Sequence, residues 1–272
     1  MSEKPAGSYK WSISAVLPAH NEAENVEKAV RDTIAALQPL ASDYEVIVVD
    51  DGSRDRTAEI VQGLQAEFPQ LRLVRHPVNR GYGGALRSGF AAATKDLIFL
   101  TPADNQFSPQ EITRLLPLIE NADIVNPYRA RRQDPWHRKL NAFAWNALIR
   151  VLFGYVARDI DCGFKLLRRE ILNLNQGRSQ GSPLRGCRVQ VHVTLTSNGA
   201  MLDTELLVGA KVRGLRIVET PVTHLPRTAG TQTGAKLGVV LKAFRDLFIF
   251  MFTFWRRLKR ELGDEKRASA RS

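Results

Sequence analysis

The sequence predicts an α/β fold, in which a mostly parallel, Rossmann-like sheet carries helices on both faces. Three observations predict it. Short apolar runs at Ser12–Leu17 and Tyr44–Val49 are typical of buried parallel strands. Segments with apolar residues at helical spacing separate such runs, and this alternation continues for about the first 125 residues. A length of 272 residues favours one unit of this kind with appendages.

The first βαβ unit begins with the run Ser12–Leu17, which ends at Pro18. Asn21 is placed to cap the next helix, which has the acidic residues Glu22 and Glu24 in its first turn. The apolar residues at helical spacing are Val26, Val30, Ile34 and Leu37. The second strand, Tyr44–Val49, is rich in β-branched residues and ends at the pair Asp50 and Asp51.

The alternation then continues with the same signals. The next expected elements are a helix capped by Ser53 or Asp55 that carries Ile60, Val61, Leu64 and Phe68, a strand at Leu71–Val74, a helix at Gly84–Ala93 and a strand at Leu97–Leu100. After that strand, Ser108, Pro109 and Glu111 form the pattern of a capping box with proline at the first helical position, and predict a helix over Ile112, Leu115 and Leu116.

The composition is that of a globular protein with an excess of basic residues. Lys and Arg outnumber Asp and Glu by 39 to 28, a net charge of +11 that suits phosphate-bearing partners. No nucleic-acid recognition motif occurs in the sequence, which argues against nucleic acid as the partner. Two cysteines form no disulfide framework, the five histidines show no zinc-site spacing, and the first ten residues have no apolar signal run. A cytoplasmic location is the default expectation.

Polar segments at three strand ends are the candidate site, because ligands of open parallel sheets bind beyond the carboxyl ends of the strands. These segments are 18–22, 50–55 and 101–106. Carboxylates such as Asp50 and Asp51 can accept hydrogen bonds from a nucleobase or from ribose hydroxyls. The alternative is that one of them only caps the following turn or helix.

Six segments in order carry a resemblance: PAHNEAEN, VIVVDDGSRDRT, NRGYGGALRSGF, PADNQFSP, DIDCGFKLLRR, and DTE with a later RTAG. Together they resemble the family 2 glycosyltransferases of the A-type (GT-A) fold. The likeness is closest to the polyprenyl-phosphate sugar synthases, such as the dolichyl-phosphate mannose synthases, and covers roughly residues 12–235. It implies a GT-A fold, a nucleotide-sugar donor, a polyprenyl phosphate acceptor and transfer with inversion.

The resemblance also implies which residues hold the donor. Pro18, Ala19 and Glu22 would line the nucleotide pocket, and Asp50 and Asp51 would hold base and ribose. The loop Asn79–Gly84, which contains Gly81, would pack beside the nucleotide. The glycines of this loop also suit a tight turn into a helix, and the loop lacks the pattern of a phosphate-cradling P-loop.

After the fourth strand the family usually has Asp-x-Asp, two carboxylates that bind a divalent metal. This chain has Pro102, Ala103 and Asp104, so the first carboxylate is missing. A Mg²⁺ or Mn²⁺ site would draw on Asp104, Gln106, water and the diphosphate. Mg²⁺ tolerates this because it often keeps several waters and takes one or two protein carboxylates.

On the acceptor side, Arg129 and Arg138 match the arginines that bind the acceptor phosphate in the lipid-linked synthases. Guanidinium groups suit phosphate, and a phosphate that is already anionic at neutral pH needs cationic positioning rather than a general base. The basic cluster around them (Arg129, Arg131, Arg132, Arg138 and Lys139) also fits a solvated basic face.

Three further acids and one arginine complete the predicted catalytic set with Asp104. Asp159 and Asp161 precede CGFKL, where the family has an acid near the acceptor side of the sugar, and Glu205 matches an acid close to the reaction centre. Asp161 or Glu205 would be the base if the acceptor were a hydroxyl. Arg227 resembles the arginine that closes over the donor diphosphate. Structural salt bridges are the alternative role for these residues.

The C-terminal segment predicts an amphipathic helix at 236–262, after a catalytic domain at 1–235 and before a disordered tail at 263–272. Its apolar stretch Leu247–Trp255 would span about 14 Å as a helix, roughly half of the hydrocarbon core of a bilayer. With the basic residues that follow, it suits the surface of an anionic membrane. The alternative is packing on the catalytic domain or on a partner.

The sequence therefore predicts an enzyme bound peripherally at the cytoplasmic membrane face, which glycosylates a polyprenyl phosphate. Two alternatives stay open: a soluble family member with a hydroxyl acceptor, and a decayed nucleotide-sugar-binding protein in which Pro102 marks a lost metal site. A dinucleotide oxidoreductase is disfavoured because the first strand ends in PAHNE rather than GxGxxG. The sugar, the nucleotide and the oligomeric state are not encoded in these motifs.

Overall fold

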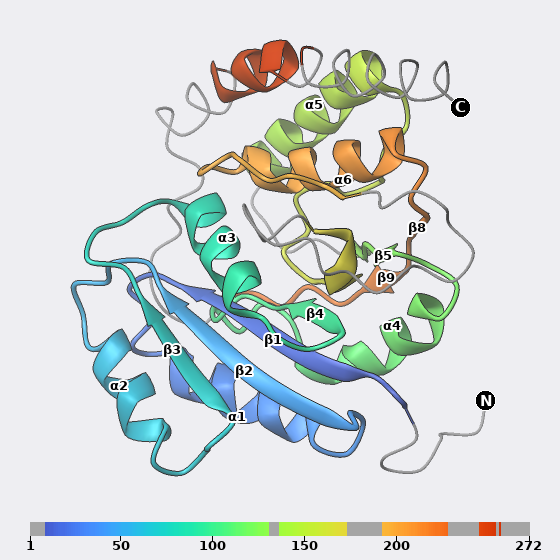
Figure 1. Ribbon diagram of the computed structural model, residues 1–272. Coiled ribbons are helices and arrows are strands. Elements are labelled where there is room, and N and C mark those ends of the chain that lie inside the picture. Colours follow the sequence, from blue (N-terminus) through green and yellow to red (C-terminus); the bar gives the residue numbers. More distant parts are fainter. Residues whose placement is uncertain (1–8, 131–135, 173–191, 228–244, 254–255, 257–272) are drawn as a thin grey trace, which may run out of the picture.

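A computed structural model describes residues 9–130, 136–172, 192–227, 245–253 and 256, with the side chains of 136–139 outside the description (Figure 1). Its main sheet has the strand order β3-β2-β1-β4-β7-β5-β8. The strands are β1 (Ser12–Ala19), β2 (Asp43–Asp50), β3 (Leu71–Arg75), β4 (Leu97–Leu100), β5 (Ile124–Val125), β7 (Lys165–Arg168) and β8 (Ile217–Val218). The first four are mutually parallel, and β7 runs antiparallel to its neighbours β4 and β5. The predicted mostly parallel sheet is confirmed.

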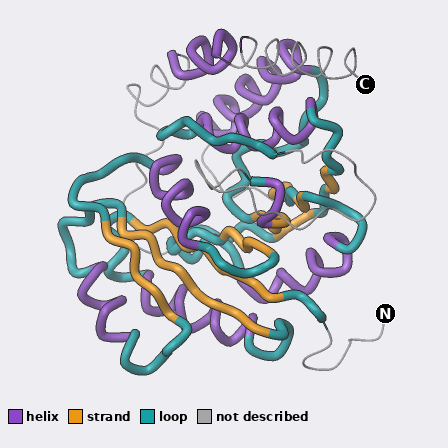
Figure 2. The backbone as a smooth tube through the Cα atoms, in the orientation of Figure 1, coloured by secondary structure: helices purple, strands orange, loops and turns teal. Residues whose placement is uncertain are grey.

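Helices cover both faces of this sheet (Figure 2). One face packs against α1 (Val26–Leu37), α2 (Thr57–Leu64) and α4 (Ile112–Ile119), and the other against α3 (Tyr82–Ala92), α5 (Trp136–Phe153) and α6 (Met201–Val212). Each face of the sheet has its own hydrophobic core, and alternate strand residues pack into one or the other. In β2, Val46 and Val48 pack into the core with α1, α2 and α4, and Ile47 and Val49 into the core with α3, α5 and α6. This is why the strands read as continuous apolar runs.

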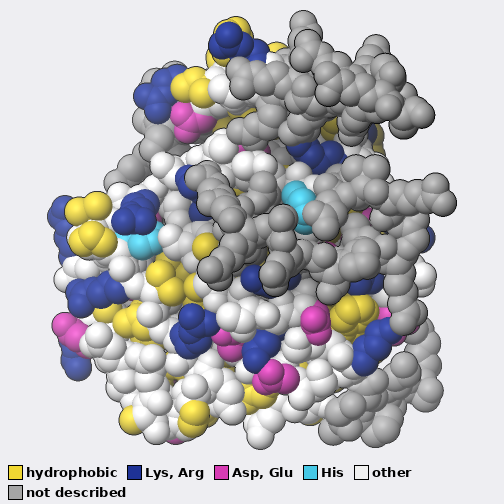
Figure 3. Space-filling view, in the orientation of Figure 1, with side chains coloured by type: hydrophobic (Ala, Val, Ile, Leu, Met, Phe, Trp, Pro, Cys, Tyr) yellow, Lys and Arg dark blue, Asp and Glu magenta, His cyan; other side chains and the backbone are white. Residues whose placement is uncertain are grey.

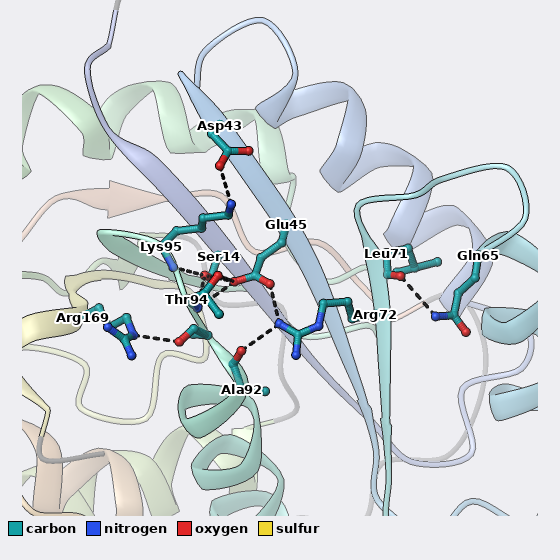
Figure 4. A network of polar contacts seen from close by, with 11 residues as sticks. Ser14, Asp43, Glu45, Gln65, Leu71, Arg72, Ala92, Thr94, Lys95 and Arg169 are labelled. Carbon is teal, nitrogen blue, oxygen red and sulfur yellow. Dashed lines mark hydrogen bonds and ion pairs between the residues drawn. The ribbon is translucent and has the colours of Figure 1, made fainter. Parts of the chain in front are cut away.

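A buried carboxylate ties the amino-terminal ends of β1 and β2 to neighbouring elements (Figure 4). Glu45 accepts hydrogen bonds from Ser14 Oγ (2.7 Å), Thr94 N (2.7 Å) and Arg72 Nη1 (2.6 Å). Although burial opposes its ionisation, these donors hold the pKa of Glu45 below its usual value. The network fixes the end of the sheet opposite to the candidate site.

Two predicted helix caps are wrong. Asn21 has φ +56° and lies in a turn, where its N–H donates to Ser53 Oγ (2.9 Å), and α1 begins only at Val26. Ser108 makes no side-chain cap, because its hydroxyl binds the side chain of Gln110 (2.7 Å), although Pro109 does open the short 3₁₀ turn Pro109–Glu111 before α4. Asp55, in contrast, accepts the N–H of Thr57 (3.0 Å) at the start of α2, as expected.

The remaining described elements lie beyond the parallel part of the sheet. Strands β6 (Tyr128–Arg129) and β9 (Pro221–Val222) form a small parallel sheet of their own. A helical stretch at 245–253 packs beside α5, and the rings of Phe153 and Phe250 lie 5.9 Å apart (Figure 1). The residues that the structure describes contain no helix that is both long and apolar enough to cross a membrane. Three segments lie outside these residues: 177–186, whose Gly, Ser, Pro and Arg composition predicts a flexible loop, the tail at 263–272 and the remainder of 236–262.

Candidate active site

The three polar strand ends meet at one edge of the sheet, as the sequence predicts. Strand β1 lies between β2 and β4, and its register pairs Pro18 with Val49 and Ala19 with Asp50. Backbone hydrogen bonds continue past the strands, from Asp51 N to Ala19 O (2.9 Å) and from Ala103 N to Pro18 O (3.3 Å). Pro18 and Ala19 therefore lie between the carboxylates that follow β2 and those that follow β4.

Asp50 ends β2 with a side chain that is fully buried. Its Oδ1 accepts the N–H of Ser53 (3.0 Å), which closes the turn after the strand. Its Oδ2 accepts no hydrogen bond from the described residues, although Arg75 Nε lies 3.5 Å away. A buried carboxylate oxygen without a hydrogen-bond donor is costly to leave unsatisfied. Asp50 therefore serves as a turn cap and keeps one acceptor available.

Asp51 is almost as buried and is engaged within the protein. Its Oδ1 accepts from Arg80 N (2.8 Å) and contacts His76 Nδ1 (2.7 Å), and its Oδ2 accepts from Gly81 N (2.9 Å). The other nitrogen of His76 contacts Ser88 Oγ (2.8 Å) in α3. The direct contact of Asp51 is thus with the glycine-rich loop, and contact with a nucleoside stays a prediction.

Arg227 joins two strand ends that are remote in sequence. Its Nη2 lies 2.5 Å from Glu22 Oε1, 205 residues away, and its Nη1 lies 3.7 Å from Asp104 Oδ2. All three side chains are at least four-fifths buried. Burial raises the pKa of Asp104, and the charge of Arg227 opposes that rise. The structure therefore brings together the predicted donor residue Glu22 and the predicted catalytic residues Asp104 and Arg227.

The segment after β4 places the two predicted metal ligands side by side. Gln106 N donates to Asp104 Oδ1 (3.1 Å), and the Gln106 side chain reaches Leu225 O (3.4 Å). Pro102, where the family has its first aspartate, packs close to Gly163, at which an added Cβ would lie 3.0 Å from Pro102 Cγ. Among the described residues no group of three or more His, Cys, Asp or Glu is arranged to hold a metal ion.

Arg129, which ends the short strand β6, forms a forked ion pair. Its Nε and Nη2 each lie 2.7 Å from an oxygen of Asp159, and its backbone N–H also donates to this carboxylate (3.2 Å). Although burial opposes the charge, Asp159 holds the pKa of Arg129 above its usual value. The guanidinium predicted to bind phosphate is thus oriented by the predicted acid. Arg138 lies in the first turn of α5, but its side chain lies outside the described residues.

Behind this pair lies a buried polar cluster that sequence reasoning partly missed. Lys165 in β7 has a fully buried ammonium group 3.1 Å from Asp203 in α6, and it also donates to the backbone oxygen of Ile160 (3.1 Å). Burial, followed by the charges of Asp203 and Asp159, raises the pKa of Asp161 to about 6. One available signal was the presence of charged residues inside the apolar runs FKLL and MLDTELL.

Glu205 is buried in α6, and both its oxygens are occupied. Oε2 accepts from Thr196 N (2.8 Å) and Ser197 N (2.9 Å), and Oε1 accepts from Thr196 Oγ1 (2.6 Å). A carboxylate that is satisfied by backbone donors is poorly placed to take a proton from an acceptor. The other predicted base, Asp161, has a pKa of about 6, which suits that task.

The order of strand-end motifs on this sheet agrees with the comparison to known families. Residues 14–174 match the sequence pattern of glycosyl transferase family 2. The chain belongs to this family. The match includes every strand-end segment of the site, whereas Glu205 and Arg227 lie beyond it.

Curated relatives of this family 2 chain include two proteins named undecaprenyl-phosphate 4-deoxy-4-formamido-L-arabinose transferase. The relative from Enterobacter sp. (strain 638) is 38% identical over 164 residues, and that from Sodalis glossinidius (strain morsitans) is 37% identical over 164 residues. These segments cover 59% of this chain and 50% of each relative, so the chain spans about half the length of the curated relatives it matches.

Solved structures with a similar fold include glucosyl-3-phosphoglycerate synthase from Mycobacterium tuberculosis. Its complex with Mn²⁺, uridine diphosphate and phosphoglyceric acid has a TM-score of 0.63 at 22% identity, and the alignment covers 87% of this chain and 77% of that chain. Its complex with Mn²⁺, uridine diphosphate and glucosyl-3-phosphoglycerate has a TM-score of 0.62. This similarity confirms the predicted GT-A fold of the family 2 chain.

Proposed function

We propose that this chain transfers a sugar from a nucleotide-sugar donor to a polyprenyl phosphate, with inversion, at the cytoplasmic face of a membrane. The observation that carries the proposal is the buried guanidinium of Arg227 between Glu22 and Asp104, at the carboxyl edge of the sheet. An anionic diphosphate placed there would meet a preoriented cation. The names of the curated relatives, which specify undecaprenyl phosphate, support this acceptor class.

The donor side of the proposal divides into a nucleoside half and a diphosphate half. Asp50 has an unsatisfied buried oxygen that suits a base N–H or a ribose hydroxyl, and Pro18, Ala19 and the loop at Gly81 would surround it. Asp104 and Gln106 would hold Mg²⁺ or Mn²⁺ together with water and diphosphate oxygens. The ion would supply charge neutralisation at the leaving diphosphate.

The acceptor side needs positioning rather than proton removal. The phosphate of a polyprenyl phosphate is largely anionic at neutral pH, so it is already a nucleophile. Arg129, held by Asp159, would orient it together with Arg138. Inversion follows if the phosphate attacks the anomeric carbon in one displacement.

Association with the membrane surface is proposed from two helices. The described stretch 245–253 exposes Phe248, Ile249 and Phe252, and α5 exposes Leu140, Phe143 and Val151 at helical spacing. In Figure 3 apolar and basic side chains lie together at the top, over the C-terminal helix. Exposed aromatic residues beside basic ones suit the interface of an anionic bilayer.

A hydroxyl acceptor is the second candidate, and the pKa of Asp161 favours it. A carboxylate with a pKa of about 6 is suited to general base catalysis near neutral pH. A polyprenyl phosphate would make this base unnecessary, so the two candidates differ in their dependence on Asp161.

The deciding experiment measures radiolabelled sugar transfer by the purified chain. UDP, GDP and dTDP sugars are first ranked by thermal shift, because a ligand that binds the folded state raises its stability. The best donor is then offered with undecaprenyl phosphate or a saccharide, with and without Mg²⁺ or Mn²⁺. We expect label in the lipid fraction. Label only in the saccharide would support the second candidate, and nucleotide binding without turnover would indicate a decayed enzyme.

A matched variant tests the acceptor site without leaving Asp159 unpaired. Arg129→Lys keeps the charge but loses the fork geometry, so it should raise the KM for undecaprenyl phosphate about tenfold. The donor KM should stay within about twofold, and Arg56→Lys, at an exposed position, is the control. An unchanged KM for the lipid would contradict the phosphate-binding role of Arg129.

A further inference from the structure

A short backbone segment connects Glu205 with the glycine-rich loop of the donor site. We call residues 196–199 the bridging segment. On one side, its Thr196 and Ser197 N–H groups donate to the Glu205 carboxylate at 2.8 and 2.9 Å. In Figure 1 this segment precedes α6 and ends beside α3. Its position is thus fixed by a charged, buried acceptor, which forms strong hydrogen bonds.

On its other side, the bridging segment touches the start of α3 at backbone level. Gly84 N donates to Asn198 O (3.2 Å), and Arg87 Nη1 donates to Thr196 O (3.0 Å). A Cβ on Gly81 would lie 2.6 Å from Asn198 O, and one on Gly83 would lie 2.6 Å from Gly199 O. The glycines are therefore required by this close approach as well as by the turn.

The same loop is also held by Asp51, which accepts the N–H groups of Arg80 and Gly81. Two buried carboxylates thus fix one loop. Asp51 binds it directly, and Glu205 binds it through the bridging segment. The Asp51 end lies at the edge of the sheet proposed to take the nucleoside.

We infer that Glu205 is a positioning residue for donor binding: it holds the bridging segment against residues 81–84 and so fixes the loop beside the nucleotide. This inference rests on the proposed function, because it presupposes that a nucleotide binds beside the loop. It assigns Glu205 no proton transfer. Glu205 lies beyond the part of the chain that matches the family pattern.

Two substitutions of Glu205 separate positioning from base catalysis. In Glu205→Gln the amide oxygen can accept both backbone N–H groups, and the amide nitrogen can donate to Thr196 Oγ1, because a hydroxyl both donates and accepts. Glu205→Ala leaves those groups unsatisfied. We expect Glu205→Ala to weaken UDP or GDP binding on the order of tenfold by calorimetry, and Glu205→Gln to keep affinity within about threefold.

The kinetic test compares the change in donor KM with the change in kcat for each variant. Loss of positioning raises the donor KM of Glu205→Ala and leaves kcat at saturating donor within about threefold. A base would instead lower kcat by about a hundredfold or more in both variants. Equal loss of kcat in the Gln and Ala variants would overturn the inference.

A second pair of variants tests the bridging segment without altering Glu205. Gly83→Ala forces Ser197 and Gly199 away from α3, and we expect it to weaken nucleotide binding about as much as Glu205→Ala. Gly63→Ala is the control, because no atom of the described part of the chain lies within 4 Å of its added Cβ. The double variant Glu205→Ala/Gly83→Ala should lose less than the sum of the single effects, since both break one connection.

The outcomes distinguish this inference from the proposed function. If the unmodified chain binds UDP or GDP and both Glu205→Ala and Gly83→Ala bind equally well, the inference is overturned and the proposed function stands. If the unmodified chain binds neither nucleotide nor any nucleotide sugar, both are overturned. Circular dichroism establishes that each variant is folded at the temperature of the titration.

Discussion

The donor-site proposal depends most on the guanidinium group of Arg227. It pairs with Glu22 at 2.5 Å and lies 3.7 Å from Asp104, and these carboxylates follow two adjacent parallel strands. Each carboxylate is largely buried, so removing the cation would leave two acids without their counter-charge. Sequence reasoning proposed Arg227 for the diphosphate, and the structure adds that it already has carboxylate partners.

Arg227→Ala should therefore reduce kcat/KM for the donor by about tenfold to a thousandfold, through loss of a preoriented charge. Arg227→Lys should recover only part of this loss, because a single ammonium does not reproduce the forked contact. Steady-state kinetics with varied donor measures the effect, and Arg56→Ala is the exposed control. Wild-type kcat/KM in Arg227→Ala would show that the donor diphosphate does not use this side chain.

The raised pKa of Asp161 predicts that the stability of the protein depends on pH. The folded pKa of about 6 lies above the ordinary value of 3.8, so the folded chain binds its proton more tightly than the unfolded chain. The stability that this proton contributes is complete below pH 3.8 and is lost as pH rises through 6. The charged groups that act on this carboxyl are Asp203, Asp159, Arg129 and Lys165.

Asp161→Asn removes that dependence. At pH 8 we expect it to raise the free energy of unfolding by up to about 2 kcal/mol, with a gain that shrinks toward pH 4. Thermal melts across this range measure the difference between variant and wild type. Asp159→Asn should destabilise the protein at pH 8, because it removes a carboxylate charge that pairs with the buried Arg129. A difference that does not change with pH would argue against a proton on Asp161.

At the scale of elements, packing of α3 on the sheet limits side-chain size at one position. An added Cβ on Gly89 would lie 2.3 Å from Val16 Cγ1 and 3.1 Å from Val49 Cγ2, which belong to β1 and β2. This approach brings the start of α3, and with it the loop at Gly81, over the carboxyl ends of those strands. The sequence shows that position 89 is a glycine, but it does not show which strands this glycine packs against.

Gly89→Ala should therefore destabilise the fold by about 1–3 kcal/mol through overpacking. Gly63→Ala in α2, whose added Cβ meets no atom within 4 Å among the residues that the structure describes, should instead stabilise it by about 0.5–1 kcal/mol. Urea unfolding of both variants measures this opposite pair of effects. Equal stabilisation by the two alanines would mean that α3 does not pack on β1 as closely as described.

At the scale of the whole molecule, the C-terminal helical stretch has two different faces. Leu247 and Phe250 are buried in the core beneath it, whereas Phe248, Ile249 and Phe252 are at least half exposed. The described part of the predicted 236–262 segment thus packs on the catalytic domain and still presents aromatic residues outward. The packing interpretation is confirmed for the inner face, and the membrane interpretation stays a prediction for the outer face.

Phe248→Ser/Phe252→Ser should weaken binding to phosphatidylglycerol-containing liposomes by about tenfold and leave thermal stability nearly unchanged, because only exposed apolar area is lost. Flotation with the full chain measures binding. Val78→Ser, another exposed apolar position, is the control. Equal flotation of all variants would remove the aromatic face from the membrane proposal, whereas deletion of the helix would also uncover Leu247 and Phe250.

The sequence alone was enough to predict the α/β class, most element positions and the meeting of three polar strand ends at one edge of the sheet, because apolar periodicity and strand-end motifs are local signals. The order of six motifs was also enough to predict the family. Only the tertiary structure placed Arg227 against Glu22, turned Asp51 toward the loop at Gly81 and occupied both oxygens of Glu205. These contacts join residues far apart in the chain or depend on rotamer and register, and no local pattern encodes which of several available donors a buried carboxylate will meet.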